Sequence, residues 1–178
     1  MVESATQVLA RRGLHATAFS EVLALTDTSR GSIYHHFPRG KAELIEAVLD
    51  DVSARVDAEL QALHGLPVDA VADGAIKVWR QWLLRVDCDA GCPVAAVTVA
   101  ADSNRLMQDC RAAFDQWIET LAGALHAAGV APARATAFAT LLVASIQGGV
   151  LLARAHGQIE PFDTVADELR AQLTRLTA

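Results

Sequence analysis

The sequence predicts an all-α protein of about nine helices, in which an N-terminal three-helix helix-turn-helix unit precedes a larger helical body. Apolar residues recur every three or four positions through most of the chain, which is the helical period. The composition is 52% hydrophobic and 5% aromatic, which suits packed helices and argues against disorder. A tight turn between two short helical segments is expected within residues 17–41, and the other elements are built around this stretch.

The first helix is expected over residues 2–12, with Ala5, Val8 and Leu9 facing inward. Gly13 is expected to end it, because a helix often ends at a residue in the left-handed conformation. Thr17 is expected to cap a short second helix, since its hydroxyl can accept from an unpaired backbone N–H group.

The turn is expected at residues 26–28, where Asp27 tolerates the left-handed conformation. Ser29 can then cap a third helix over residues 30–36, in which Ile33 and Phe37 share the inner face. Two short helices joined by such a turn form a helix-turn-helix, whose second helix can enter the major groove of DNA. The remaining side chains of this helix are donors and rings without a carboxylate, and Gly31 lets the backbone approach a partner closely.

The rest of the chain shows six further helical segments, separated by Gly, Pro or Asp-rich breaks. The first of them links the helix-turn-helix to the body, so we predict a DNA-binding domain over residues 1–47 and a ligand-binding and dimerisation domain over 48–178. The six segments cover residues 41–63, 68–86, 93–101, 103–128, 132–156 and 162–176.

The N-terminal motif resembles the DNA-binding domain of the TetR family of transcriptional repressors. The resemblance rests on Gly13, Thr17, the run Gly31-Ser32-Ile33-Tyr34-His35-His36-Phe37 and the following Lys41. Gly91-Cys92-Pro93 before an Ala/Val helix resembles the LmrA/YxaF-like subgroup, while Asp27 replaces the Gly that is usual in the turn.

The resemblance implies which residues contact DNA. Phosphate-positioning residues carried over from matching family positions are Thr17, Ser29, Tyr34, His35 and Lys41. Base-edge candidates are Arg30, which suits a guanine edge, and then Ser32 and His36.

The resemblance also implies a small-molecule inducer site in the body, lined by apolar rings and a few polar groups. The inducer is expected to be apolar or aromatic, because no cluster of like charges marks a partner for an ion. Ordinary core packing is the alternative for most of the residues concerned. The candidates are Trp79, Trp82, Met107, Phe114, Trp117, Phe138 and Gln147.

A two-fold dimer is expected, because two reading helices must meet successive major grooves about 34 Å apart. The last two helices are the candidate interface, and small residues on the first of them permit close helix approach. The alternative is that both helices complete the monomer core. The small residues are Ala137, Ala144, Ser145, Gly148 and Gly149.

The formal net charge is −6, yet residues 1–47 hold equal numbers of basic and acidic side chains, so the excess negative charge belongs to the body.

The chain start lacks a signal-peptide pattern, so a reduced cytoplasmic compartment is expected for Cys88, Cys92 and Cys110. Their spacing does not favour a metal or redox site, and we predict no metal and no cofactor. The uncharged run over residues 135–153 contains Thr, Ser, Gln and Gly-Gly, which favours a helix buried between subunits over a membrane span.

No nucleophilic triad, phosphate loop or paired-carboxylate motif stands out, so the protein is not expected to be an enzyme. The sequence therefore favours a DNA-binding regulator, most simply a repressor that an inducer releases from a palindromic operator. The alternative is a cytoplasmic helical small-molecule-binding protein or enzyme without DNA binding.

Overall fold

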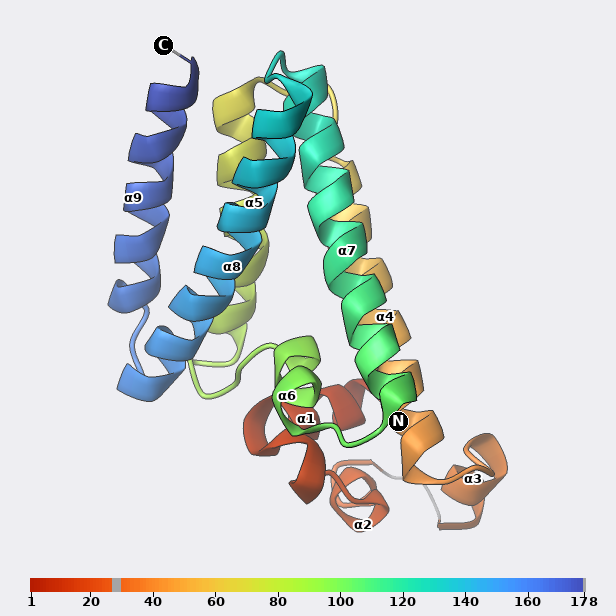
Figure 1. The fold of residues 1–178 in the computed structure, drawn as a ribbon. Coiled ribbons are helices and arrows are strands. Elements are labelled where there is room, and N and C mark those ends of the chain that lie inside the picture. The colour runs from red at the N-terminus through yellow and green to blue at the C-terminus, as the bar shows by residue number, and fades with distance from the viewer. Residues whose placement is uncertain (27–29, 178) are drawn as a thin grey trace. The chain divides into compact units, whose positions relative to one another are not determined.

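The computed structural model describes the backbone of residues 1–26 and 30–177 and the side chains of residues 1–26 and 31–173. Over these residues the chain forms nine helices and no strand, which confirms the all-α prediction (Figure 1). The helices are α1 (Val2–Ala16), α2 (Phe19–Leu23), α3 (Arg30–His36), α4 (Lys41–Gln61), α5 (Val68–Arg85), α6 (Pro93–Ala100), α7 (Asn104–Ala127), α8 (Pro132–His156) and α9 (Glu160–Thr177).

The boundary between α1 and α2 differs from the prediction. Gly13 adopts a φ of 77°, as a helix-ending glycine would, but the chain then resumes a short helical turn to Ala16. Thr17 follows as the C-terminal cap of α1, and its hydroxyl donates to the Gly13 carbonyl at 2.9 Å. The residue before α2 is Ala18, which has no side-chain cap, so the prediction of Thr17 as an N-cap was wrong.

Internal contacts divide the chain into two compact units. Unit 1 comprises Met1–Ala54 and Ala90–Ala113, and unit 2 comprises Arg55–Asp89 and Phe114–Ala178. Helices α4 and α7 each pass from one unit into the other. The predicted functional boundary near residue 47 stays a prediction, since contacts alone do not test it.

In unit 1, α1 packs against α6. The contact buries Leu9 of α1 and Val94 and Val97 of α6 completely. The backbone N–H of Gly91 donates to the Ala10 carbonyl at 2.9 Å, so the loop before α6 is fixed to α1 by a hydrogen bond as well as by packing. Pro93 begins α6 because a proline has no N–H group to leave unpaired in the first turn.

In unit 2, α8 packs along α9, and α5 packs against both (Figure 1). Gly149 is buried at the α8–α9 contact, where an added Cβ would lie 3.1 Å from the Phe162 ring. Gly148 is exposed with nothing within 4 Å of the same position. The two adjacent glycines therefore face different surroundings, and Gly149 belongs to the monomer core.

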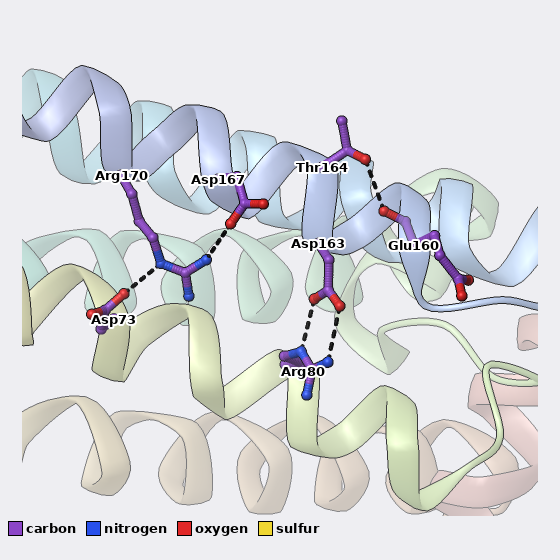
Figure 2. A network of polar contacts seen from close by, with 7 residues as sticks. All are labelled: Asp73, Arg80, Glu160, Asp163, Thr164, Asp167 and Arg170. Carbon is purple, nitrogen blue, oxygen red and sulfur yellow. Dashed lines mark hydrogen bonds and ion pairs between the residues drawn. The ribbon is translucent and has the colours of Figure 1, made fainter.

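Ion pairs between side chains also join α9 to α5 (Figure 2). Arg80 donates to the Asp163 carboxylate through Nε at 2.7 Å and Nη2 at 2.9 Å, which is the bidentate geometry of a strong pair. Arg170 donates to Asp73 at 2.6 Å and to Asp167 at 2.8 Å. The hydrogen bond from Arg80 is the main reason that the pKa of Asp163 is lowered.

Helix α8 is long and apolar enough to cross a membrane by length and composition, with a mean hydropathy of 1.8 over 18 residues. It passes this test alone among the helices of the described residues. Because 44% of that window is already buried against the rest of the chain, the features of α8 are also those of a core helix.

We predict that Gly149→Leu destabilises the protein by about 1–3 kcal/mol, because the new side chain must displace Phe162. Urea unfolding at fixed protein concentration measures the change. Gly123→Ala is the matched control, since this exposed α7 glycine has open space around it and alanine favours a helix by up to about 1 kcal/mol. A Gly149→Leu protein as stable as the wild type would contradict the close α8–α9 contact.

The Arg80–Asp163 pair should contribute at most about 1 kcal/mol at neutral pH, because both side chains are partly exposed and water screens the charges. Asp163 has a lowered pKa in the folded protein, so this stability is present above the unfolded pKa near 3.8 and is lost as pH falls through the folded value. A double-mutant cycle with Arg80→Met and Asp163→Asn should therefore give a coupling energy at pH 7 that shrinks below about pH 4. A coupling energy independent of pH would show that the pair is not ionic.

Candidate nucleic-acid interface

Helix α3 presents a polar outer face because two apolar side chains hold its inner face. Ile33 is fully buried and Phe37 is 8% exposed, while Tyr34 is 60% exposed and His35 and His36 are exposed beside it. The inward and outward sides match the helical spacing expected from the sequence. No Asp or Glu lies on this helix to repel a phosphate.

Tyr34 is held by a ring on the neighbouring helix. The Phe19 ring of α2 meets it edge to face, with the ring centroids 5.2 Å apart. These two rings, with Ser20 and Leu23, line a surface hollow of about 270 Å³ between α2 and α3. The contact leaves Tyr34 at the surface, where its hydroxyl can reach a partner. This contact between rings on two different helices is not visible in the helical periodicity of the sequence.

Lys41, at the start of α4, binds the end of α1. Its ammonium donates to the carbonyls of Leu14 at 2.6 Å and His15 at 3.3 Å. A cation stabilises the carbonyls at a helix end, and partial burial here lowers the pKa of Lys41. An ammonium has three N–H groups, so one remains for a phosphate oxygen. Lys41 thus joins two helices of unit 1, and its contact with DNA stays a prediction.

Thr17 is poorly placed to contact DNA. Its side chain is fully buried, its hydroxyl donates to Gly13, and its backbone N–H donates to the Leu14 carbonyl at 3.3 Å. Both donors are occupied, so we leave Thr17 out of the proposed interface. The predicted turn at Asp27, the residue Ser29 and the side chain of Arg30 lie outside the described part of the structure.

Two other basic residues of this unit already have carboxylate partners. Arg12 pairs with Glu21, and Arg39 pairs with Glu43 at 3.4 Å and Glu46 at 3.0 Å. The hydrogen bond to Glu46 is the largest cause of the raised pKa of Arg39. The charges of Arg12 and Arg39 are therefore largely balanced by neighbouring carboxylates.

The predicted inducer residues are only partly brought together. Trp117 is fully buried in α7 and meets Trp79 of α5 and Phe114 edge to face, with centroids 5.7 Å and 5.3 Å apart. Phe138 of α8 is also buried in unit 2. Trp82 is half-buried, with the Arg85 guanidinium 6.0 Å from its ring centroid.

Met107 does not belong with these rings. It lies on the part of α7 that belongs to unit 1, and its side chain is 40% exposed. The sequence grouped Met107 with Phe114 because both lie on one helix, but α7 changes unit between residues 113 and 114. Gln147, on α8, is partly buried and lies in unit 2.

The three cysteines are buried, and none of them is part of a disulfide. Burial is the main cause that raises the pKa of the Cys88 and Cys110 thiols, so both are protonated at neutral pH. The Cys110 thiol donates to the Val94 carbonyl at 3.6 Å, as a packed side chain of unit 1. These environments disfavour a reactive or metal-binding thiolate.

Comparison with known proteins agrees with this helical arrangement. Residues 2–48 match the model of bacterial regulatory proteins of the tetR family, and residues 67–168 match the LmrA/YxaF-like C-terminal domain of transcriptional regulators. An HTH-type transcriptional regulator of Mycobacterium tuberculosis is 38% identical over 96% of this chain and 90% of its own length. The HTH-type transcriptional regulator LmrA of Bacillus subtilis is 24% identical, covering 85% of this chain and 83% of its own.

Solved structures show the same fold. A TetR transcriptional regulator from Legionella pneumophila superposes with a TM-score of 0.85 at 19% identity, over 98% of this chain and 93% of its own. A regulatory protein TetR from Rhodobacter sphaeroides gives a TM-score of 0.86 at 17% identity, over 96% and 95%. With the two sequence matches, which together span both parts of the chain, these likenesses show that the chain belongs to the TetR family of helix-turn-helix transcriptional regulators, with an LmrA/YxaF-like C-terminal domain.

Proposed function

We propose that this regulator is a cytoplasmic homodimeric repressor that binds a palindromic operator and is released by an apolar or aromatic inducer. The observation that carries the proposal is the outer face of α3, where Tyr34, His35 and His36 are exposed above the buried Ile33 and Phe37. Such a face can lie in the major groove, with hydroxyl and imidazole groups against phosphates and base edges. The side chains of Ser32 and Lys41 and the exposed backbone at Gly31 complete the proposed interface.

A second copy of the chain is needed because one short helix reads only half of a palindrome. The described part of the chain offers an apolar face for it on α8. Leu141 is 41% exposed and Leu151 is 67% exposed, and small residues lie between them. The spacing along this face alternates between four and three residues, as in paired helices, and none of its members is charged. The members are Ala137, Leu141, Ala144, Gly148, Leu151 and Ala155.

Helix α9 is packed along α8 and completes the proposed interface at its side. Its exposed residues include Asp167 and Glu168, which suit a polar rim better than an apolar centre. A bundle of α8 and α9 from two copies would therefore place its apolar centre on α8.

Inducer release requires that the ligand favour an arrangement of the dimer in which the two α3 helices no longer fit successive grooves. The buried rings of Trp79 and Trp117 in unit 2 supply apolar surface for such a ligand. Helices α4 and α7 connect unit 2 with unit 1 along the chain, so a change in either helix reaches the reading unit.

We predict salt-dependent binding to a palindrome in the DNA flanking the protein's own gene, measured by gel shift and fluorescence anisotropy. Lys41→Met should weaken binding to all sequences alike and reduce the slope of log K against log salt by about one unit, because one phosphate contact is lost. Lys77→Met is the matched control, since it removes an exposed Lys from unit 2. An unchanged slope with reduced affinity would mean that Lys41 acts only through the Leu14 and His15 carbonyls.

We predict that Leu151→Glu converts the dimer to a monomer in sedimentation velocity at micromolar concentration, because two carboxylates would meet in the apolar centre of the interface. Leu84→Glu is the control, since Leu84 is 52% exposed on α5, outside the proposed face. The monomer should also lose most of its operator affinity. A dimeric Leu151→Glu protein would exclude this face of α8 as the interface.

A further inference from the structure

Gln147 of α8 is a partly buried residue of unit 2 whose side-chain amide lacks hydrogen-bond partners in the described part of the chain. Its side-chain nitrogen and oxygen are both shielded from solvent, and neither has a hydrogen-bond partner among the residues that the structure describes. Buried amides are normally paired, because removing donor and acceptor from water without replacement is unfavourable. An amide with both groups unpaired is therefore a candidate for binding something that the isolated chain does not contain.

The position of Gln147 on α8 indicates which side its amide faces. Gly149 faces Phe162 of α9, and each residue of an α-helix is rotated by about 100° from the one before. Gln147 is two residues from Gly149 and therefore points about 200° away from the α9 contact. Two of its helical neighbours, Val143 and Val150, are 4% and 2% exposed, whereas Ala144 and Leu151 on its other side are exposed. Gln147 therefore lies where the buried side of α8 borders its exposed side, with its amide shielded from solvent.

The fully buried side chains of unit 2 are apolar. No described side chain of unit 2 that is buried carries a charge, since the buried polar side chains are Thr6 and Thr17 of unit 1. Helix α5 of unit 2 also packs against α8 and carries the buried Trp79. A charged ligand would leave its charge unpaired here, whereas flat uncharged rings could pack against Trp79 and Trp117.

We propose that Gln147 is the polar anchor of the inducer site and that the inducer is an uncharged aromatic compound carrying a hydrogen-bond acceptor beside a donor, as in a lactam. A primary amide holds its carbonyl and NH₂ side by side, so it can accept and donate in parallel to such a group. This inference rests on the proposed inducer site in unit 2 and gives that site its chemistry.

The test uses the full-length dimer without DNA and two matched probes. 2-Quinolinone has an N–H beside its carbonyl, whereas 1-methyl-2-quinolinone lacks the donor but keeps the rings. Tryptophan quenching and calorimetry should show that the wild type binds 2-quinolinone at least about ten-fold more tightly than the methylated probe. Gln147→Leu should lower the affinity for 2-quinolinone to that for the methylated probe.

Gln158→Leu is the matched control, since it makes the same change at an exposed residue before α9 and should keep the preference. Equal wild-type affinities for the two probes would overturn the proposal, as would a preference that persists in Gln147→Leu. Absence of binding by either probe at millimolar concentration would overturn the ligand class.

A second measurement tests the unpaired amide itself. Gln147→Leu should raise the melting temperature of the ligand-free protein, because it removes two unpaired polar atoms from the interior. A lower melting temperature would reveal an internal partner for the amide and overturn the proposal. Without ligand, the Gln147→Leu protein should bind the operator as tightly as the wild type does. Failure of the wild-type protein to bind DNA would contradict the proposed repressor function, but it would leave the proposed ligand contact of Gln147 intact.

Discussion

The burial of Ile33 and Phe37 is the constraint on which the DNA-reading surface depends. A helix of seven residues is not stable in water by itself, because too few hydrogen bonds follow the costly first turn. Helix α3 therefore exists only as long as these two side chains are packed into unit 1. The same packing fixes which side chains face outward, and the Phe19 ring then restricts Tyr34. Stability and the proposed recognition thus use opposite faces of one helix, so we expect outer residues to vary without unfolding it.

The net charge of −6 is compatible with DNA binding because residues 1–47 hold equal numbers of basic and acidic side chains. Arg12 and Arg39 are each held by carboxylates, and Lys41 is engaged by the carbonyls at the end of α1. These three basic groups thus contribute to the contacts within unit 1. Long-range attraction to DNA is weak for a segment with balanced charges, so we expect its affinity to come from close contacts.

Helical periodicity predicted the elements well, because apolar spacing reports which face of a helix is buried. It placed Ile33 and Phe37 inside and Tyr34 outside without knowledge of their neighbours. Helical periodicity did not predict features that depend on contacts with residues distant in the sequence. Gly13 has a positive φ of 77°, but its ψ of 176° is not that of the left-handed cap expected, and the sequence does not show that the chain turns helical again before Thr17.

Sequence patterns also failed to predict which candidate inducer residues lie together. Met107 and Phe114 share one helix, yet the division of α7 between two units separates them. Gly148 and Gly149 are adjacent and alike in sequence, and only the position of Phe162 distinguishes the core glycine from the exposed one. The missing partners of Gln147 are likewise a property of its neighbours, which no pattern in the sequence reports.

The two faces of α8 explain why this helix resembles a membrane span. A helix that is apolar all around must be covered all around, by lipid or by protein. Gly149 and Val150 face the interior of unit 2, whereas Leu151 is exposed on the other side. If a second copy covers that side, α8 becomes a helix shared by two cores, and its mean hydropathy of 1.8 needs no bilayer. Dimerisation and the composition of α8 then have one physical cause, the need to remove both apolar faces of a single helix from water.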